Sequence, residues 1–384
     1  MKILVLGAGR VGSAIAVDLA ADRSLDVRVA DRDPARLQQL ENAYGLLGER
    51  IDLSLPSTVT RAAGEADAVV SAVPGFLGYR TLEAVLAAGR PVVDIAFFPE
   101  DPLTLDAAAK RSGVPAIVDC GVAPGMSNIL VAHASSRLDE TSSVSIYVGG
   151  LPETRVGPFE YRAVFSPIDV IEEYTRPARV VANGGVAVRD ALSDLEILHF
   201  PGIGDLEAFT TDGLRTLTRT IHAPHMIEKT LRYPGHADKI KLLRDIGLFS
   251  RKPVDLDDGT SLRPIDLTTA LLFPLWQLQP GERDMTVMRI QVEGLAAAQP
   301  VRYTYDLLDR FDDASGTTSM ARTTGYAATM ALRLLAEGRF DKPGVHPPET
   351  LGRRPECVDF LLKGLAERGI TYRETIESPA EDSA

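Results

Sequence analysis

Apolar runs alternate with helical patterns through the first third of the chain. Short, continuous apolar runs occur at residues 3–6, 27–30, 68–73, 91–95 and 116–118. Runs of this kind are typical of parallel strands that are buried on both faces. Helical spacing of apolar residues separates them, as in 14–19 and 82–88. The alternation predicts an α/β fold with a doubly wound parallel sheet of the Rossmann type.

From residue 121 the pattern changes to α+β. Apolar and polar residues alternate through 144–148, and Gly149-Gly150 follows. This pattern predicts a strand that enters a turn. Asn183-Gly184-Gly185 follows an apolar run and predicts a hairpin. The segments 285–292 and 301–307 read as paired antiparallel strands.

A long helical pattern returns near residue 319. The segment 344–377 predicts one more helix and a strand at 370–372. We therefore expect a dinucleotide-binding domain made of residues 1–120 and about 319–384. Residues 121–318 would form a substrate-binding and dimerisation domain.

Composition narrows the classes of function. Lys+Arg is 41 and Asp+Glu is 53, so the net charge is 41 − 53 = −12. An acidic chain argues against nucleic acid and anionic membranes as partners, because both need a basic face. No apolar run reaches the ~18 residues of a membrane span. The two cysteines lie far apart without metal spacing, which predicts a cytoplasmic protein with no cysteine metal site.

The first motif with chemistry is Gly7-Ala8-Gly9-Arg10-Val11-Gly12, a G-x-G-x-x-G loop between a strand and a helix. In that context Gly7 permits a tight turn, Gly9 lets the backbone approach a pyrophosphate, and Gly12 allows close packing of helix on strand. The helix N-terminus, which includes Arg10 and Val11, then offers N–H groups to phosphates.

Asp31 ends the second predicted strand, roughly 20 residues past the loop, where a carboxylate accepts hydrogen bonds from a ribose 2′-OH. It would repel a 2′-phosphate, so NAD is favoured over NADP. Arg32 either stacks on adenine or pairs with a 2′-phosphate. Asp52 either reaches the adenine amino group or is a solvated loop acid.

The carboxyl ends of parallel strands line the cofactor crevice. The residues that follow or end these strands, and that we expect around the nicotinamide, are Val73, Pro74, Asp94, Asp119 and Gly121.

Several strings in the second domain carry a family resemblance. They are Gly121-Val122-Ala123-Pro124-Gly125-Met126-Ser127-Asn128, Tyr147-Val148-Gly149-Gly150-Leu151-Pro152, Phe209-Thr210-Thr211-Asp212-Gly213-Leu214 and Thr230-Leu231-Arg232-Tyr233-Pro234-Gly235-His236. With the glycine loop, they resemble the saccharopine dehydrogenase-like family, and within it the lysine 6-dehydrogenase subgroup.

The resemblance implies NAD-dependent oxidative deamination of the ε-amino group of L-lysine to allysine, with release of ammonia, as in lysine degradation. It also implies a homodimer or higher homo-oligomer and an amino-acid substrate. One alternative is a saccharopine-type oxidoreductase on a related amino acid, with NADP. An alternative of another class is a non-catalytic NAD-binding sensor or assembly partner, because a fold does not fix a function.

Three residues are the first candidates for the chemistry. Arg232 is our candidate for the substrate carboxylate, which a guanidinium binds bidentately; the alternative is a structural salt bridge. His236 is a candidate proton acceptor, because histidine titrates near neutrality. Asp119 is a candidate base or counter-ion, and its alternative is packing.

Five further residues stand in the matched strings or near them. Thr211 and Asp212 either line the pocket or cap a helix. Gly149 and Gly150 offer close backbone approach or a turn, and Tyr161 is a candidate polar wall. The sequence contains no metal-binding or phosphate-loop motif, so we expect no metal.

Overall fold

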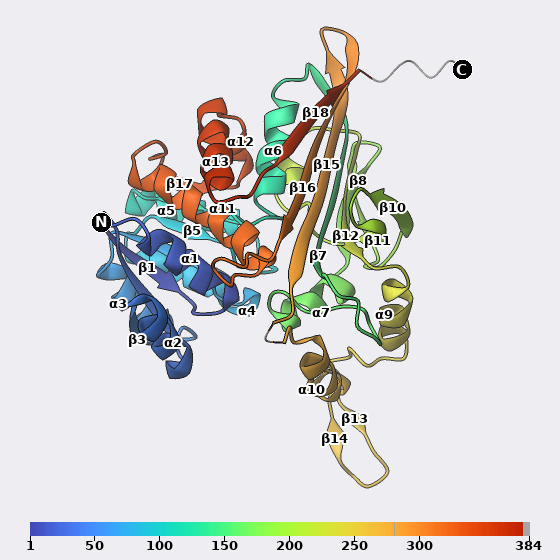
Figure 1. The fold of residues 1–384 in the computed structure, drawn as a ribbon, viewed down its shortest axis with the longest axis horizontal. Coiled ribbons are helices and arrows are strands. Elements are labelled where there is room, and N and C mark those ends of the chain that lie inside the picture. Colours follow the sequence, from blue (N-terminus) through green and yellow to red (C-terminus); the bar gives the residue numbers. More distant parts are fainter. Residues whose placement is uncertain (280, 379–384) are drawn as a thin grey trace. The chain divides into compact units, whose positions relative to one another are not determined.

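The chain divides into two compact units (Figure 1). The computed structural model describes residues 1–279 and 281–378. The first unit comprises Met1–Arg137 and Met320–Tyr372, and the second comprises the described residues of Leu138–Ser319 together with 373–378, which the sequence had placed in the first domain. The last residues of the predicted first domain, 379–384, lie outside the described part.

A parallel sheet forms the centre of the first unit. Within the described residues its seven strands follow the order β17-β6-β5-β4-β1-β2-β3. The strands are β1 (Lys2–Leu6), β2 (Asp26–Asp31), β3 (Leu47–Arg50), β4 (Ala68–Ser71), β5 (Val92–Asp94), β6 (Pro115–Ile117) and β17 (Gly344–His346). Most of their side chains are buried, as expected for a sheet covered on both faces.

Helices connect and cover these strands. They are α1 (Arg10–Ala20), α2 (Pro34–Tyr44), α3 (Pro56–Gly64), α4 (Gly75–Ala87), η1 (Pro102–Leu105), α5 (Asp106–Ser112), α6 (Met126–Ser135), α11 (Ser319–Ala336), α12 (Glu349–Gly352) and α13 (Pro355–Glu367). The start and stop signals are local. In α2, the Asp33 side chain caps the first turn, Pro34 occupies the first helical position, and Gly45 ends the helix with φ of 67°.

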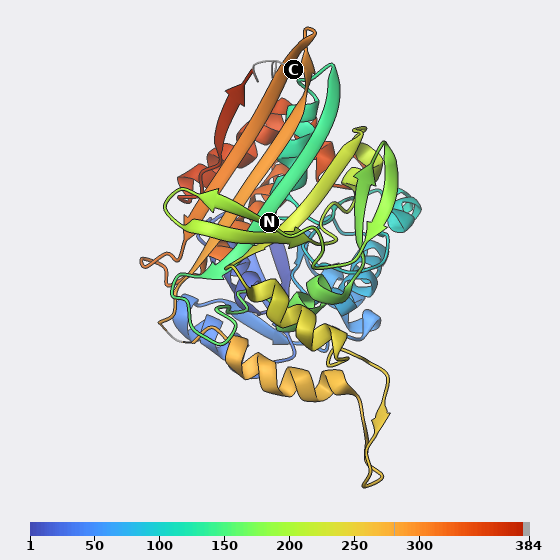
Figure 2. The same cartoon turned by 90° about the vertical axis from the view of Figure 1, so that its right-hand side faces the viewer.

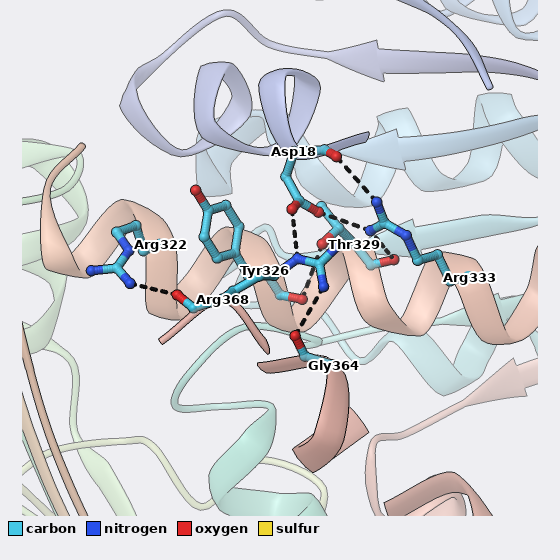
Figure 3. A network of polar contacts seen from close by, with 7 residues as sticks. All are labelled: Asp18, Arg322, Tyr326, Thr329, Arg333, Gly364 and Arg368. Carbon is cyan, nitrogen blue, oxygen red and sulfur yellow. Dashed lines mark hydrogen bonds and ion pairs between the residues drawn. The ribbon is translucent and has the colours of Figure 1, made fainter. Parts of the chain in front are cut away.

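The C-terminal helices pack on the N-terminal ones through polar and close contacts. Asp18 on α1 accepts hydrogen bonds from Arg333 Nη1 (2.8 Å) and Arg368 Nε (2.5 Å), as Figure 3 shows. Both guanidinium groups also bind backbone carbonyls, so each is held in two directions. Residues 320–372 are thereby fastened to the helix that follows the glycine loop.

Helix α6 belongs to the first unit, which differs from the predicted boundary at residue 120. A Cβ on Gly352 would lie 2.2 Å from the carbonyl oxygen of Ile129, so glycine lets α12 contact the α6 backbone. The Asn128 side chain donates to buried Glu349 at 3.0 Å. These contacts join residues more than 200 positions apart, and no local pattern indicates them.

A mixed sheet forms the second unit. Its main path in the described residues is β10-β11-β12-β7-β15-β16-β18; off this path, β8 pairs with β12 and β9 pairs with β8. The strands are β7 (Glu140–Pro152), β8 (Ala178–Ala182), β9 (Gly185–Arg189), β10 (Glu196–Phe200), β11 (Gly204–Thr210), β12 (His225–Arg232), β15 (Asp284–Ala296), β16 (Gln299–Arg310) and β18 (Arg373–Glu377), with a separate hairpin of β13 (Val254–Asp255) and β14 (Ser261–Leu262). The long strands β7, β15 and β16 run side by side (Figure 2).

Four helices accompany this sheet: α7 (Pro167–Thr175), α8 (Leu217–Thr220), α9 (His236–Asp245) and α10 (Pro264–Trp276). An aromatic core that includes Tyr161, Tyr174 and Trp276 lies among α7, α9 and α10. A second core, with Tyr147 and Leu231, covers the opposite face of the sheet.

Several sequence-based expectations are confirmed. Asn183 and Gly184 take φ of 51° and 76° in the β8–β9 hairpin, as a two-residue turn requires. The predicted antiparallel pair is β15 with β16.

Three expectations were wrong in detail. The strand at 144–148 continues as β7 through Gly149 and Gly150 instead of entering a turn. The last segment holds two helices, α12 and α13, rather than one. The final strand lies at Arg373–Glu377, because pairing with β16 rather than apolar content fixes it. Among the described residues, no helix is long and apolar enough to cross a bilayer.

Candidate functional site

The glycine loop of the first unit packs closely against the protein at Gly7 and Gly12 and leaves space at Gly9. Gly7 has φ of +105°, and a Cβ there would lie 2.6 Å from the Ala72 carbonyl oxygen. A Cβ on Gly12 would lie 2.0 Å from the Gly7 oxygen, so α1 can approach β1 only with glycine. At Gly9, the N-cap of α1, the nearest described atom beyond its neighbours is Arg36 Nη1 at 3.9 Å from a Cβ position. This geometry fits a pyrophosphate beside a helix N-terminus.

Asp31 is fastened to the same loop. Its Oδ2 accepts from the Ala8 N–H at 2.6 Å, and its Oδ1 accepts from the Asp33 N–H at 2.9 Å. The carboxylate is half-buried with a fixed orientation and keeps lone pairs for a ribose hydroxyl. Arg32 is exposed beside it.

The other cofactor candidates of this unit lie around the loop or further out. Arg10 and Val11 form the first turn of α1. Asp52 is exposed, and its Oδ1 accepts from the Ser54 hydroxyl (2.6 Å) and N–H (3.0 Å), which lowers its carboxyl pKa. The structure thus gives Asp52 a local turn role, and its contact with adenine stays a prediction.

Carboxylates and a thiol gather at the carboxyl ends of β5 and β6. Asp94 is fully buried and accepts from the Ala96 N–H at 3.1 Å, while the Cys120 N–H donates to the Asp94 carbonyl oxygen at 2.9 Å. Asp119 is buried with φ of 51°. Burial, with the nearby Asp119 and Asp94 charges, raises the pKa of Cys120 to about 12, so the thiol stays protonated. Val73 and Pro74 lie between β4 and α4, the first buried and the second exposed.

The loop after β6 is locked by its glycines. A Cβ on Gly125, where φ is +136°, would lie 2.0 Å from the Gly121 carbonyl oxygen. The Gly121 N–H donates to the Pro124 oxygen at 3.0 Å, and Asn128 Oδ1 accepts from the Gly125 N–H at 3.2 Å. The matched string at 121–128 is therefore a rigid turn at the end of the sheet.

In the second unit, Arg232 is buried in an aromatic and acidic cage. Its Nη2 donates to Glu173 Oε2 at 3.0 Å, its Nη1 to the Leu231 oxygen at 2.9 Å and its Nε to the Tyr174 hydroxyl at 3.3 Å. The guanidinium carbon lies 4.5 Å from the Tyr161 ring centre. Burial alone would lower the pKa of Arg232, but the neighbouring Tyr174, Tyr161 and Glu173 raise it, so the charge is permanent. A substrate carboxylate would have to share this guanidinium with Glu173.

His236 completes this cage. Its two ring nitrogens contact the Phe159 carbonyl oxygen (Nδ1, 3.1 Å) and the Tyr174 hydroxyl (Nε2, 2.9 Å). A carbonyl only accepts, so Nδ1 carries the proton and Nε2 accepts from Tyr174. Burial, with the nearby Arg232 charge, lowers the pKa of His236 to about 3. Both nitrogens are occupied, and the proton-acceptor role stays a prediction that requires the Tyr174 hydrogen bond to open.

A polar row runs along one face of β12. Glu228, Thr230 and Arg232 alternate along the strand, so their side chains share a face. All three are buried. Thr211 lies beside this row and donates to Glu228 Oε2 at 2.6 Å, and its Oγ1 lies 2.8 Å from Thr230 Oγ1.

The remaining candidates of the second unit have structural partners. Asp212 holds Arg179 bidentately, at 2.8 and 2.9 Å. A Cβ on Gly149 would lie 2.6 Å from the Leu231 oxygen, so this glycine permits close packing of β7 on β12. Gly150 on β7 pairs with Thr286 on the neighbouring strand β15. The Tyr161 ring lies beside the His236 ring at a tilt of 59°, with ring centres 5.2 Å apart.

Sequence reasoning did not select Glu228, Thr230, Glu173 and Tyr174 as candidate site residues. The signal for the first two was present, because polar residues at alternate positions of a buried strand indicate a polar face. Glu173 and Tyr174 are about 60 positions from Arg232, and only the fold joins them.

These features define a Rossmann-type dinucleotide-binding protein with a second, polar-faced α/β unit. Family models agree: residues 3–117 match the saccharopine dehydrogenase NADP binding domain, and residues 121–370 match the saccharopine dehydrogenase C-terminal domain. The chain belongs to the saccharopine dehydrogenase family of oxidoreductases.

The relatives below are distant in sequence but match nearly the whole chain. The chain is 22% identical to the mitochondrial alpha-aminoadipic semialdehyde synthase of Bos taurus, covering 97% of this chain and 47% of that protein. It therefore spans about half the length of that relative. It is 23% identical to the NADP⁺-dependent, L-glutamate-forming saccharopine dehydrogenase of Saccharomyces cerevisiae, covering 97% of this chain and 98% of the relative. The apo structure of the L-Glu-forming saccharopine dehydrogenase of that yeast has the same fold, with a TM-score of 0.80 at 21% identity over 98% of this chain and 99% of the other.

In the described residues, no group of three or more His, Cys, Asp or Glu side chains could hold a metal ion.

Proposed function

We propose that this oxidoreductase oxidises the ε-carbon of L-lysine to an imine, with NAD as the hydride acceptor, and that water hydrolyses the imine to allysine and ammonia. The observation that carries the cofactor part is Asp31, whose carboxylate is fixed against the glycine loop at Ala8. A negative charge at this position favours a free ribose 2′-OH and disfavours a 2′-phosphate. The lysine part rests on the resemblance of the second-domain strings.

The cofactor supplies the hydride acceptor when it is bound. The residues of this chain would bind and orient the cofactor and the substrate. The loop at Gly9 and the N-terminus of α1 would hold the pyrophosphate, and Asp31 would hold the adenosine ribose. The buried ends of β5 and β6 would surround the nicotinamide, and Cys120, which stays protonated, adds no nucleophile there.

The substrate half needs a charged anchor and a place for a proton. Arg232 is the proposed anchor for the substrate α-carboxylate, with Glu173 as the group that holds the guanidinium in the free protein. A lysine ε-ammonium has an ordinary pKa of about 10.4, so the enzyme must take a proton from it before hydride transfer.

A second candidate function is a saccharopine-type reaction with NADP. The family model carries an NADP binding domain, and the yeast relative is named for NADP⁺ and L-glutamate formation. The exposed Arg32 beside Asp31 is the residue that would pair with a 2′-phosphate.

Product analysis separates the candidates. The purified protein is given L-lysine or saccharopine with NAD⁺ or NADP⁺, and reduced cofactor, ammonia and L-glutamate are measured. The proposal expects reduced cofactor and ammonia from lysine. L-Glutamate from saccharopine, with no turnover of lysine, would support the second candidate. Cofactor binding without turnover of any amine would support the third alternative, a non-catalytic NAD-binding sensor.

The homodimer stays a prediction, which analytical ultracentrifugation of the purified protein tests.

A further inference from the structure

Three buried side chains of the second unit form a continuous line of hydrogen bonds that ends on a carboxyl group. Thr230 Oγ1 lies 2.8 Å from Thr211 Oγ1, and Thr211 Oγ1 lies 2.6 Å from Glu228 Oε2. Glu228 Oε2 also accepts from the Gly213 N–H at 3.1 Å. Since an ionised carboxylate only accepts, Thr211 donates to it and accepts from Thr230. The line therefore has a direction, from Thr230 to Glu228.

We propose that Thr230, Thr211 and Glu228 form a proton relay that takes the proton from the substrate ammonium. This inference rests on the proposed function. Thr230 is the entry point, since its hydroxyl proton points to Thr211 and its lone pairs are left to accept. Thr230 lies two residues from Arg232 on the same strand face, beside the proposed carboxylate anchor.

The step balances without a co-reactant. One N–H bond of the ammonium breaks, and its proton binds to Thr230. The Thr230 proton passes to Thr211, and the Thr211 proton passes to Glu228. The products are a neutral amine and a neutral carboxylic acid at Glu228, and both threonines regain their hydroxyl groups. No electrons move in this step.

The surroundings of Glu228 suit a proton acceptor that works at mildly alkaline pH, above its raised pKa. The carboxylates whose charges act on Glu228 are Glu173 on α7 and Asp212 after β11. Each is paired with a guanidinium, Arg232 and Arg179 respectively. Buried Arg215 follows in the same loop as Asp212. Burial first, and then the charges of Glu173 and Asp212, raise the pKa of Glu228 to about 8, although the Thr211 hydrogen bond opposes the shift.

The sequence leaves room for this carboxyl group at one position. A Cβ on Gly213 would lie 2.4 Å from Glu228 Cδ and 2.5 Å from Oε2. Gly213 has no positive φ that would otherwise require glycine. Glycine at this position therefore leaves the space that the Glu228 carboxyl occupies.

The test compares pH profiles of kcat and KM for amine oxidation in the wild type and in Glu228→Gln, Thr211→Val and Thr230→Val. The relay expects the wild-type rate to fall as pH drops below about 8, because a protonated Glu228 cannot accept. Glu228→Gln should lower kcat about 100-fold or more and lose that limb of the profile. The two valine variants should lower kcat with little change in KM, and Thr211→Ser and Thr230→Ser should restore it.

A matched control is Glu207→Gln, another buried carboxyl of this sheet that accepts from the Gly235 and Ala237 N–H groups at 2.7 and 2.8 Å. It should keep the pH profile of the wild type. An active wild type whose folded Glu228→Gln variant keeps its rate and profile would overturn the relay alone. A wild type that is inactive on every amine would overturn the proposed function and the relay with it.

Discussion

The carboxylate of Asp31 accepts a hydrogen bond from the backbone N–H of Ala8 at 2.6 Å. This contact fixes the end of β2 against the glycine loop, so one acidic side chain holds the loop and, in the proposed function, supplies the charge next to the cofactor ribose. The choice between NAD and NADP should therefore depend on this residue.

Replacing that charge should change cofactor use. Asp31→Ser should lower the kcat/KM ratio of NAD⁺ to NADP⁺ by at least about tenfold, a change of about 1.4 kcal/mol, because the repulsion of a 2′-phosphate is lost. Initial rates with both cofactors measure it. Asp33→Ser is the control, since Asp33 caps α2 and a serine still caps. An unchanged ratio in Asp31→Ser would remove the 2′-OH assignment.

His236 should make the fold sensitive to acid. Its pKa is lowered in the folded protein from 6.5 to about 3, so the unfolded chain binds more protons between these pH values. The stability that the neutral ring contributes is complete above pH 6.5 and is lost as pH falls toward 3. Urea unfolding at pH 7 and pH 5 should show a smaller loss for His236→Gln than for the wild type. The exposed His199, changed to Gln, is the control. Equal losses for the wild type and His236→Gln would contradict the buried neutral ring.

Gly213 should tolerate no side chain. Gly213→Ala places a Cβ 2.5 Å from Glu228 Oε2, so the carboxyl must move and its contact with Thr211 is strained. We expect a loss of stability of about 1–3 kcal/mol, as for overpacking, and a lower kcat. In Gly185→Ala, the nearest atom would be 3.8 Å from the new Cβ, so that variant should behave as the wild type. Urea unfolding of the two variants and the wild type measures the difference in stability. Equal free energies of unfolding would argue against the tight fit at Glu228.

The C-terminal segment should depend on Asp18. Arg333 and Arg368 both donate to this mostly buried carboxylate, and Asp18→Asn would leave two guanidinium groups without their counter-charge (Figure 3). Removing one member of a buried ion pair costs on the order of 3 kcal/mol. Unfolding in guanidinium chloride should show this loss for Asp18→Asn and a much smaller one for Asp22→Asn, whose half-buried carboxylate accepts hydrogen bonds from the N–H and hydroxyl of Ser24. A loss below 1 kcal/mol would show that packing alone holds the segment.

Local patterns predicted the elements that depend on local physics. The glycine loop, the short buried strands and the Asn183-Gly184 hairpin follow from spacing, burial and turn chemistry, and each was read correctly. The end of β7 was not, because Gly149 resembles a turn residue in sequence and becomes a strand residue only when Leu231 packs against it.

Long-range contacts explain the rest of what the sequence did not show. Arg232 was selected for its charge, but its Glu173 partner is 59 residues away and comes from another element. Glu228 gains its properties from Thr211 and from burial, neither of which its own neighbours in sequence reveal.

The most direct test of the account is the formation of reduced nicotinamide by the purified protein with L-lysine and NAD⁺, followed by its absorbance together with released ammonia. The account predicts equal amounts of NADH and ammonia, with NADP⁺ a poorer acceptor. No NADH with L-lysine, while another amino-acid substrate reduces either cofactor, would contradict the proposed reaction.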